Sequence, residues 1–178
     1  MSRARRRPSP RPPRPAIVVE VSDRQKLLRV SVRGLERLVR GALAAEGIER
    51  AEIGIVLVDD RKIAAVHRRW LGVPGPTDVI TFDLSAGAGV AAGPGVLAGD
   101  IVVSTETARR MARVVGSTPR RELAYYVVHG VLHLTGHDDH DPADRRAMRA
   151  RERAVMKACG LPPPPRSRAV GTSPSPSP

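Results

Sequence analysis

The sequence predicts an α+β fold in which one small mixed sheet of four strands packs with about five helices. Two kinds of segment predict it: four short β-branched runs of strand length, and five longer stretches with the residue pattern or capping signals of helices. The two kinds do not alternate strictly, which favours an α+β arrangement over a doubly wound parallel sheet. With 178 residues, the chain is long enough for one domain with a real core.

The first half of this domain is predicted to contain strand, helix, strand and helix in that order. Residues 16–22 form a short run rich in β-branched side chains, which indicates a strand. Residues 24–46 carry leucine and valine at three- and four-residue spacing, so a helix is expected there. Residues 51–58 alternate as a second strand, and Asp59-Asp60 should cap a helix that runs through Trp70.

The middle of the chain adds two strands and a helix. After a loop rich in glycine and proline, residues 78–84 form the third predicted strand. Residues 85–95 are rich in glycine and alanine, so we expect a surface loop. A fourth strand follows at 97–104, and a helix capped by Ser104 or Thr105 runs to about Val115.

Two helices complete the domain, and each begins with proline in its first turn. Thr118-Pro119 opens a helix that ends at Gly136, a residue suited to the left-handed conformation after a helix. Pro142 opens the last helix, which is expected to reach about Cys159. The four aromatic residues of the chain are expected in packing roles; they are Trp70, Phe82, Tyr125 and Tyr126.

Both ends of the chain are predicted to be disordered. Residues 1–15 hold six Arg and five Pro, and residues 160–178 hold seven Pro and two Arg, with little apolar surface to bury in either. The globular domain is therefore expected at 16–159, and the net charge of +12 falls to +4 within it. A basic leader attracts phosphate backbones such as RNA, although it is equally compatible with a solvated tail.

The single cysteine, Cys159, excludes an internal disulfide and a Cys-rich zinc module. A reducing compartment is therefore expected. No run of about 18 apolar residues occurs, and the short run after the basic leader does not form a signal-peptide core. We therefore expect a cytoplasmic protein without a membrane partner.

His129 and His133 indicate a site for a divalent metal ion. Residues i and i+4 lie on one face of a helix, about 6 Å apart along its axis, so both imidazoles can reach one ion. A third ligand must come from the turn after Gly136. His137 lies too far along the helix direction, which leaves Asp139 and His140, and residue type favours His140.

Three separate motifs resemble the YbeY family of bacterial endoribonucleases and rRNA maturation factors. They are PTDVITF at 76–82, GDI at 99–101 and HGVLHLTG at 129–136, and the resemblance spans about residues 50–156. It implies a mixed sheet with helices, one zinc ion, and a role in maturing the 3′ end of small-subunit ribosomal RNA and in ribosome quality control. The implied partners are ribosomal RNA and proteins of the small ribosomal subunit, with no DNA.

The resemblance also bears on the third metal ligand. The usual family motif is H-G-x-L-H-L-x-G-x-D-H, whose third histidine stands six residues after the second; here that place is Asp139, and His140 comes one residue late. This chain is similar to a branch of the family with Asp at that place. The resemblance therefore implies His129, His133 and Asp139 as zinc ligands and catalytic residues, with His140 as the alternative.

Two further residues are candidates for catalysis. Most family members have an arginine that acts on the RNA phosphate, and counting back from Pro76 puts Leu71 at that place. Arg69 or Arg68 is a candidate replacement, since a guanidinium binds phosphate through two parallel hydrogen bonds, although both are equally compatible with ordinary arginines on a helix surface. Asp100 is either a hydrogen-bond acceptor for a ligand histidine, a positioner of substrate, or a capping residue near Ser104.

Three rival functions are weighed against a zinc-dependent endoribonuclease. A zinc protease of the H-E-x-x-H type uses the Glu as general base, but Gly130 stands at that position and cannot transfer a proton. Two His and one Asp also match the ligand set of mononuclear iron oxygenases, but no other motif supports this. A non-catalytic ribosome-assembly factor, in which metal stabilises the fold, stays open because of Leu71.

Overall fold

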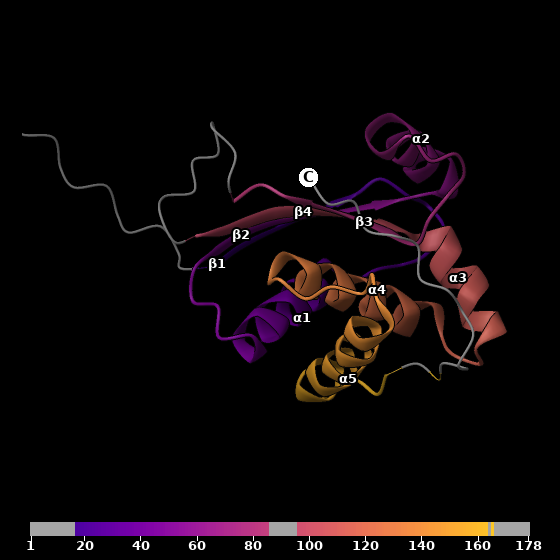
Figure 1. The fold of residues 1–178 in the computed structure, drawn as a ribbon. Coiled ribbons are helices and arrows are strands. Elements are labelled where there is room, and N and C mark those ends of the chain that lie inside the picture. Colours follow the sequence, from indigo (N-terminus) through magenta and orange to yellow (C-terminus); the bar gives the residue numbers. More distant parts are fainter. Residues whose placement is uncertain (1–16, 86–95, 164, 166–178) are drawn as a thin grey trace, which may run out of the picture.

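A four-stranded sheet of order β1-β2-β4-β3 lies at the centre of the protein (Figure 1). The structure is a computed structural model that describes residues 17–85, 96–163 and 165. The strands are β1 (Ile17–Asp23), β2 (Ala51–Val58), β3 (Val79–Asp83) and β4 (Leu97–Ser104). β1, β2 and β4 run parallel, whereas β3 pairs with β4 in the antiparallel direction at the edge. The predicted mixed sheet is confirmed.

Helices cover both faces of this sheet. Within the described ranges they are α1 (Val32–Ala45), α2 (Asp60–Leu71), α3 (Thr105–Val114), α4 (Pro119–Leu134) and α5 (Pro142–Ala158). In Figure 1, α1 and α4 lie beneath the sheet with α5 below them, and α2 lies above it. The predicted α+β class with five helices is therefore confirmed.

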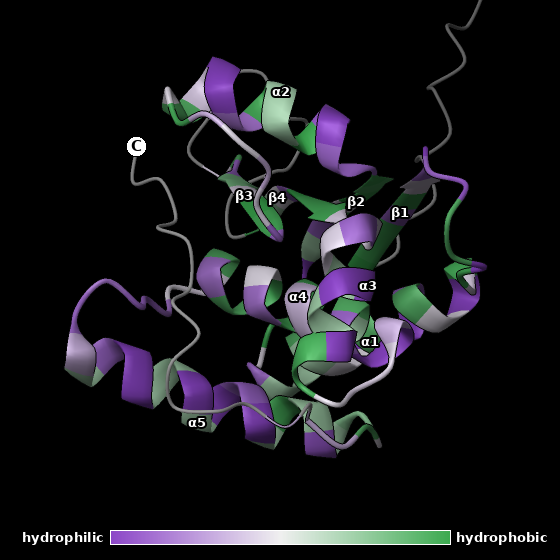
Figure 2. Cartoon of the chain, turned by 90° about the vertical axis from the view of Figure 1, so that its right-hand side faces the viewer, coloured by the Kyte–Doolittle hydropathy of each residue, from purple (hydrophilic) through white to green (hydrophobic). Residues whose placement is uncertain are grey.

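The alternation of side chains along β4 builds a separate core on each face of the sheet. Ile101 belongs to the large cluster shared with α1, α4 and α5, whereas its neighbour Val102 belongs to a smaller cluster with Ile63 of α2 and Ile80 of β3. Successive residues of a strand point to opposite faces, which separates these two positions. Figure 2 shows the result: the strands are largely hydrophobic, while α2 and α5 carry hydrophilic residues.

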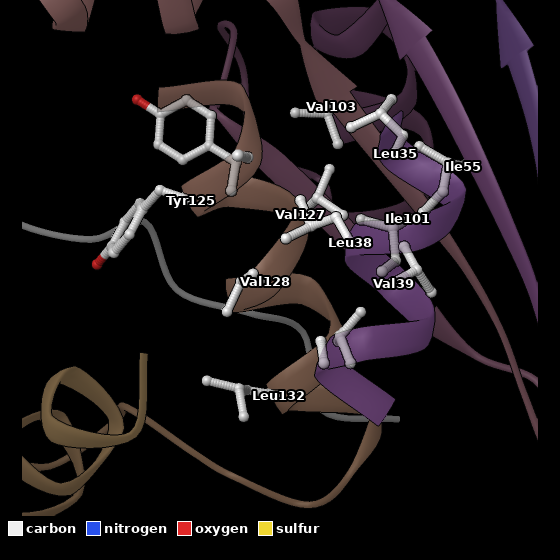
Figure 3. Packing of buried hydrophobic residues seen from close by; sticks show 14 of the residues in the cluster. Leu35, Leu38, Val39, Ile55, Ile101, Val103, Tyr125, Val127, Val128 and Leu132 are labelled. Carbon is white, nitrogen blue, oxygen red and sulfur yellow. The ribbon is translucent and has the colours of Figure 1, made fainter. Parts of the chain in front are cut away.

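Helix α4 lies in the middle of the large core. Nearly all of its residues from Glu122 to Leu134 are buried, because it contacts α1, α3, α5 and the sheet. Figure 3 shows Val127 of α4 among Leu38 of α1 and Ile101 of β4. A helix enclosed on all sides holds its side chains in defined positions, and this is the helix that carries His129 and His133.

Every helix in the described part of the chain begins with a side chain that accepts a hydrogen bond from a first-turn N–H group. The N-cap residues are Ser31, Asp59, Ser104, Thr118 and Asp141. Each such cap stabilises a helix by about 1 kcal/mol. The caps expected from the sequence at Asp59, Thr118 and the 104–105 pair are thus present.

The predicted start of the first helix at residue 24 is wrong, since α1 begins at Val32. The side-chain oxygen of Gln25 accepts hydrogen bonds from the backbone N–H groups of Leu27 and Leu28, at 2.6 and 2.8 Å. A side chain that bonds to its neighbouring backbone competes with helix formation. Residues 24–31 therefore form a connection, and Ser31 caps the helix after it.

The expected packing role of Trp70 is only partly present. Its side chain is 63% exposed, although its ring meets the edge of Phe82 with centroids 5.9 Å apart. Trp70 lies near the end of α2, and the next residue, Leu71, packs against the small core. Tyr125 and Tyr126 are buried, as expected.

The predicted leader at 1–15, most of the loop at 85–95 and most of the tail at 160–178 lie outside the described residues. Leu161, just past the predicted end of the domain, packs against the large core. Among the helices that the structure describes, none is long and apolar enough to cross a membrane.

Candidate metal centre

The last two turns of α4 bring two imidazole rings together. The Nε2 atoms of His129 and His133 are 2.9 Å apart, and their ring planes meet at 79° with centroids 4.5 Å apart. This is the convergence that the i, i+4 spacing predicts. Because α4 is enclosed by its neighbours, His129 is 5% exposed.

The turn after α4 folds back and places Asp139 beside this pair. Gly136 takes a φ of 93°, and the N–H of His137 donates to the carbonyl of Leu132. A residue with φ in this range is normally glycine, because a Cβ is strained there. Asp139 is 5% exposed, and its Oδ1 lies 3.8 Å from Nε2 of His133.

A second contact fixes this turn to α1. Glu46 follows the C-terminal end of α1, and its Oε2 lies 2.9 Å from Nε2 of His137. Its Oε1 accepts a hydrogen bond of 2.6 Å from Nε of Arg151 in α5. The turn that carries Asp139 is therefore held between two helices.

The residues present fit a divalent cation. One ligand atom from each of His129, His133 and Asp139 lies within 4.8 Å of the others, and Oδ2 of Asp139 is buried without a hydrogen-bond partner among the described residues. A buried carboxylate oxygen is costly unless an ion or a donor meets it. Imidazole and carboxylate together bind zinc and similar divalent metals.

His140, the alternative third ligand, is oriented differently. Its side chain is 44% exposed, and its Nε2 lies 3.4 Å from Oδ1 of Asp138. Asp138, Asp139 and His140 form a second group whose ligand atoms are within 4.8 Å of one another, but two of its members are exposed. The group that contains both α4 histidines includes Asp139 and not His140.

Burial and the neighbouring charges affect the two imidazoles in opposite ways. Burial by itself lowers the pKa of His129, but the hydrogen bond and charge of Glu152, aided by Asp78 and Asp139, leave that pKa raised from 6.5. Burial first, and repulsion from His129 second, lower the pKa of His133 to about 4. His133 therefore has a neutral ring at neutral pH, as a metal ligand requires.

Glu152 of α5 is a site residue that the sequence did not reveal. It is 2% exposed; its Oε1 lies 2.6 Å from Nδ1 of His129, and its Oε2 accepts a 2.6 Å hydrogen bond from the hydroxyl of Tyr125. One signal was available. Glu152 stands within the buried stripe of α5 formed by Met148, Val155 and Met156, where a charge needs a partner.

Asp78 was also missed as a site residue, although its motif was noted. Its charge helps to raise the pKa of His129, and β3, which begins at the next residue, contacts α4. Its Oδ1 accepts hydrogen bonds from the hydroxyl of Thr77 and the N–H of Val79. The 76–82 motif therefore brings a negative charge toward α4 at the start of β3.

The structure does not bring Asp100 to the histidines. A Cβ added to Gly99 would meet Leu134 of α4, so Gly99 faces α4 and Asp100 faces away from it. Asp100 instead lies against Gly54 of β2, where its Oδ1 would be 2.1 Å from an added Cβ. Ser104, not Asp100, caps α3. Of the roles considered for Asp100, a hydrogen bond to a ligand histidine does not fit this orientation.

Arg69 is likewise separated from the metal group. It is exposed near the end of α2, and its guanidinium carbon lies 5.6 Å from the ring centroid of Trp70. α2 covers the sheet face opposite α4, as Figure 1 shows. Leu71, which occupies the place expected for an arginine, packs against the small core.

Comparisons with known proteins agree with the motifs and the fold. The family described as Endoribonuclease YbeY matches residues 20–160. A protein named Endoribonuclease YbeY from Anaeromyxobacter sp. (strain Fw109-5) is 41% identical over 145 residues, covering 82% of this chain and 73% of that protein. One of the same name from Pelotomaculum thermopropionicum is 41% identical over 129 residues, covering 71% and 85%.

A solved structure shares the fold. The solution structure of a protein from Thermotoga maritima matches with a TM-score of 0.54 and 21% sequence identity, over 80% of this chain and 88% of that one. At this identity the match supports the fold alone. The family match over most of the chain, together with relatives at about 40% identity, shows that this protein belongs to the YbeY endoribonuclease family.

Proposed function

We propose that this protein is a zinc-dependent endoribonuclease that cuts single-stranded RNA. Its proposed role is in 16S rRNA 3′-end maturation and ribosome quality control in the cytoplasm, with ribosomal RNA and small-subunit proteins as partners. The observation that carries the proposal is the buried group of His129, His133 and Asp139, whose ligand atoms lie within 4.8 Å of one another. The names of the relatives support the choice of RNA cleavage.

The three side chains have distinct tasks in this proposal. His129 and His133 present their Nε2 atoms, and Asp139 supplies a negative charge that offsets part of the charge of the ion. Three protein ligands leave a position for solvent, as in catalytic rather than structural zinc sites. A bound zinc ion would supply a Lewis acid that polarises phosphate or activates water.

Basic residues outside the metal group are proposed to hold the RNA. We propose that Arg69 contacts an RNA phosphate beyond the metal centre, since its guanidinium is exposed and suits a phosphate. The +6 leader at residues 1–15 would add attraction that does not depend on RNA sequence. Because Asp100 faces away from α4, a role in positioning substrate would place its contact on the opposite face of the sheet from the histidines.

The test is cleavage of RNA by purified protein that has been stripped of metal and then reloaded with zinc. We expect single-stranded RNA to be cut only after reloading, and duplex RNA to be cut much less. His129→Ala and His133→Ala should each abolish cleavage, whereas His140→Ala, which changes an exposed histidine next to the group, should retain it. The readout is the appearance of fragments on a denaturing gel.

The competing function is a non-catalytic ribosome-assembly factor, and Leu71 favours it. This residue is packed against the small core and offers no charge to a phosphate. RNA binding without cleavage, with any divalent metal, would support that function and contradict the endoribonuclease proposal.

A further inference from the structure

Helix α5 places a buried carboxylate, that of Glu152, next to the candidate metal ligands His129, His133 and Asp139. Glu152 is 2% exposed, yet both of its oxygens are engaged: Oε1 lies 2.6 Å from Nδ1 of His129 and Oε2 lies 2.6 Å from the hydroxyl of Tyr125. Burying a carboxylate is unfavourable unless donors meet it. Two short hydrogen bonds meet this one, so its position in the core is specific.

The bond between Glu152 and His129 determines which ring nitrogen carries the proton. A carboxylate oxygen accepts at 2.6 Å, so Nδ1 of His129 is the donor. In the neutral ring the lone pair then lies on Nε2, the atom that faces His133 at 2.9 Å. The ring is therefore held in the tautomer and orientation that a metal ligand needs.

Tyr125 completes this arrangement from the same helix as His129. The two residues are four apart on α4, and their rings lie 6.4 Å apart and tilted by 30°. The Tyr125 hydroxyl donates a buried hydrogen bond to the second oxygen of Glu152 and limits rotation of the carboxylate. Tyr125 thus holds one carboxylate oxygen of Glu152, and the other oxygen orients the ring of His129.

We propose that Glu152, supported by Tyr125, is a positioning residue that prepares His129 for metal binding and couples the docking of α5 to the metal centre. α5 begins at Pro142, three residues after Asp139. A displacement of this helix would therefore disturb a ligand and the partner of a ligand together. The proposal rests on the proposed function only in treating His129 as a metal ligand.

The test compares zinc affinity in variants of the full-length protein without RNA. Metal-free protein is titrated with zinc chloride against a chromogenic chelator. Because partners of ligand histidines typically contribute 10–100-fold to metal affinity, we expect Glu152→Gln to weaken zinc binding by at least about tenfold. Tyr125→Phe, which removes only the hydroxyl, should have a smaller effect in the same direction.

Glu122→Gln is the matched control. Glu122 is also a fully buried glutamate, but it lies in the first turn of α4, seven positions before His129. Its replacement should change the stability of the fold and leave zinc affinity within about twofold. Equal loss of affinity in Glu122→Gln and Glu152→Gln, or unchanged affinity in Glu152→Gln, would overturn the proposal.

A second readout keeps the inference independent of enzymatic activity. The ¹⁵N chemical shifts of His129 in metal-free protein, recorded at a pH high enough to keep the ring neutral, distinguish a protonated Nδ1 from a protonated Nε2. We expect Nδ1 protonation in the wild type, and a loss of this preference in Glu152→Gln. If the wild type binds no zinc, the proposed function fails, whereas an Nε2-protonated His129 in the wild type would refute the positioning role itself.

Discussion

Gly130 of α4 lies so close to Ile101 of β4 that a Cβ added to it would be 2.7 Å from Cγ2 of Ile101. The same Cβ would be 3.2 Å from the hydroxyl of Thr81 in β3. Helix α4 therefore rests on the sheet at the residue directly after His129. A glutamate at this position, as in the H-E-x-x-H proteases, would have to displace the helix.

Gly130→Ala should lower the stability of the fold and weaken metal binding together. The methyl group meets Ile101, a fully buried side chain in the packed core, so α4 must move away from β4. Overpacking of this kind costs about 1–3 kcal/mol. Urea unfolding and zinc titration measure the two effects. Gly34→Ala in α1 is the comparison, because its Cβ would meet only the exposed Ser31, at 3.1 Å; an equal loss of zinc affinity there would contradict the explanation.

Asp139→Ala should reduce zinc retention more than His140→Ala does. Asp139 is buried with one oxygen unpartnered among the described residues, whereas His140 is exposed and faces Asp138. Metal content after dialysis against a weak chelator provides the measurement. Equal or reversed losses in the two variants would overturn the choice of Asp139 as the third ligand.

Zinc should stabilise the folded protein through the same group. An ion that binds only the native state at 100 times its Kd adds about 2.7 kcal/mol to the free energy of unfolding. Thermal melts with zinc and with a strong chelator should therefore differ in the wild type. The difference should vanish in His133→Ala, which lacks one ligand, and a full shift in that variant would show that zinc binds elsewhere.

Asp60 should stabilise the fold at neutral pH but not in strong acid. Burial by itself raises the pKa of its carboxyl, but hydrogen bonds from Ser104, Thr107 and Arg110 outweigh burial and leave that pKa lowered from 3.8. A carboxyl with a lowered folded pKa contributes stability above the unfolded value of 3.8. This contribution is lost as the pH falls through the folded pKa.

Asp60→Asn should therefore lower the free energy of unfolding by about 1 kcal/mol at pH 7. The gap between wild type and variant should shrink below pH 3.8, which urea titrations at several pH values can follow. The control is Asp83→Asn, since Asp83 is an exposed carboxylate at the end of β3. A gap for Asp60→Asn that grows as the pH falls would have the wrong sign.

The convergence of His129 and His133 was predictable because it depends on helix geometry alone. Four residues make about one turn, so their spacing on one helix determines that their rings share a face. The strands and helix caps were predictable for a similar reason, since each depends on residues close in the chain. The late start of α1 was missed because the side chain of Gln25 bonds to its own neighbours and competes with the helical pattern.

The remaining parts of the site depend on elements that are distant in the sequence. Glu152 meets His129 because α5 packs across α4, and 23 residues separate the two positions. The side chain of Asp100 lies on the sheet face away from the histidines, because Gly99, not Asp100, faces α4. No local pattern states which strand face a distant helix will cover.

The sequence by itself determined the α+β class and the pair of imidazoles on one helix face, because periodicity and spacing express local geometry. Three motifs in the sequence also carried the resemblance to the YbeY family. Only the tertiary structure distinguished Asp139 from His140 by burial and revealed Glu152 behind His129. It also showed that the side chain of Trp70, which was expected to pack in the core, is 63% exposed. These features follow from how helices and strands pack against one another, and packing is a property of the whole chain.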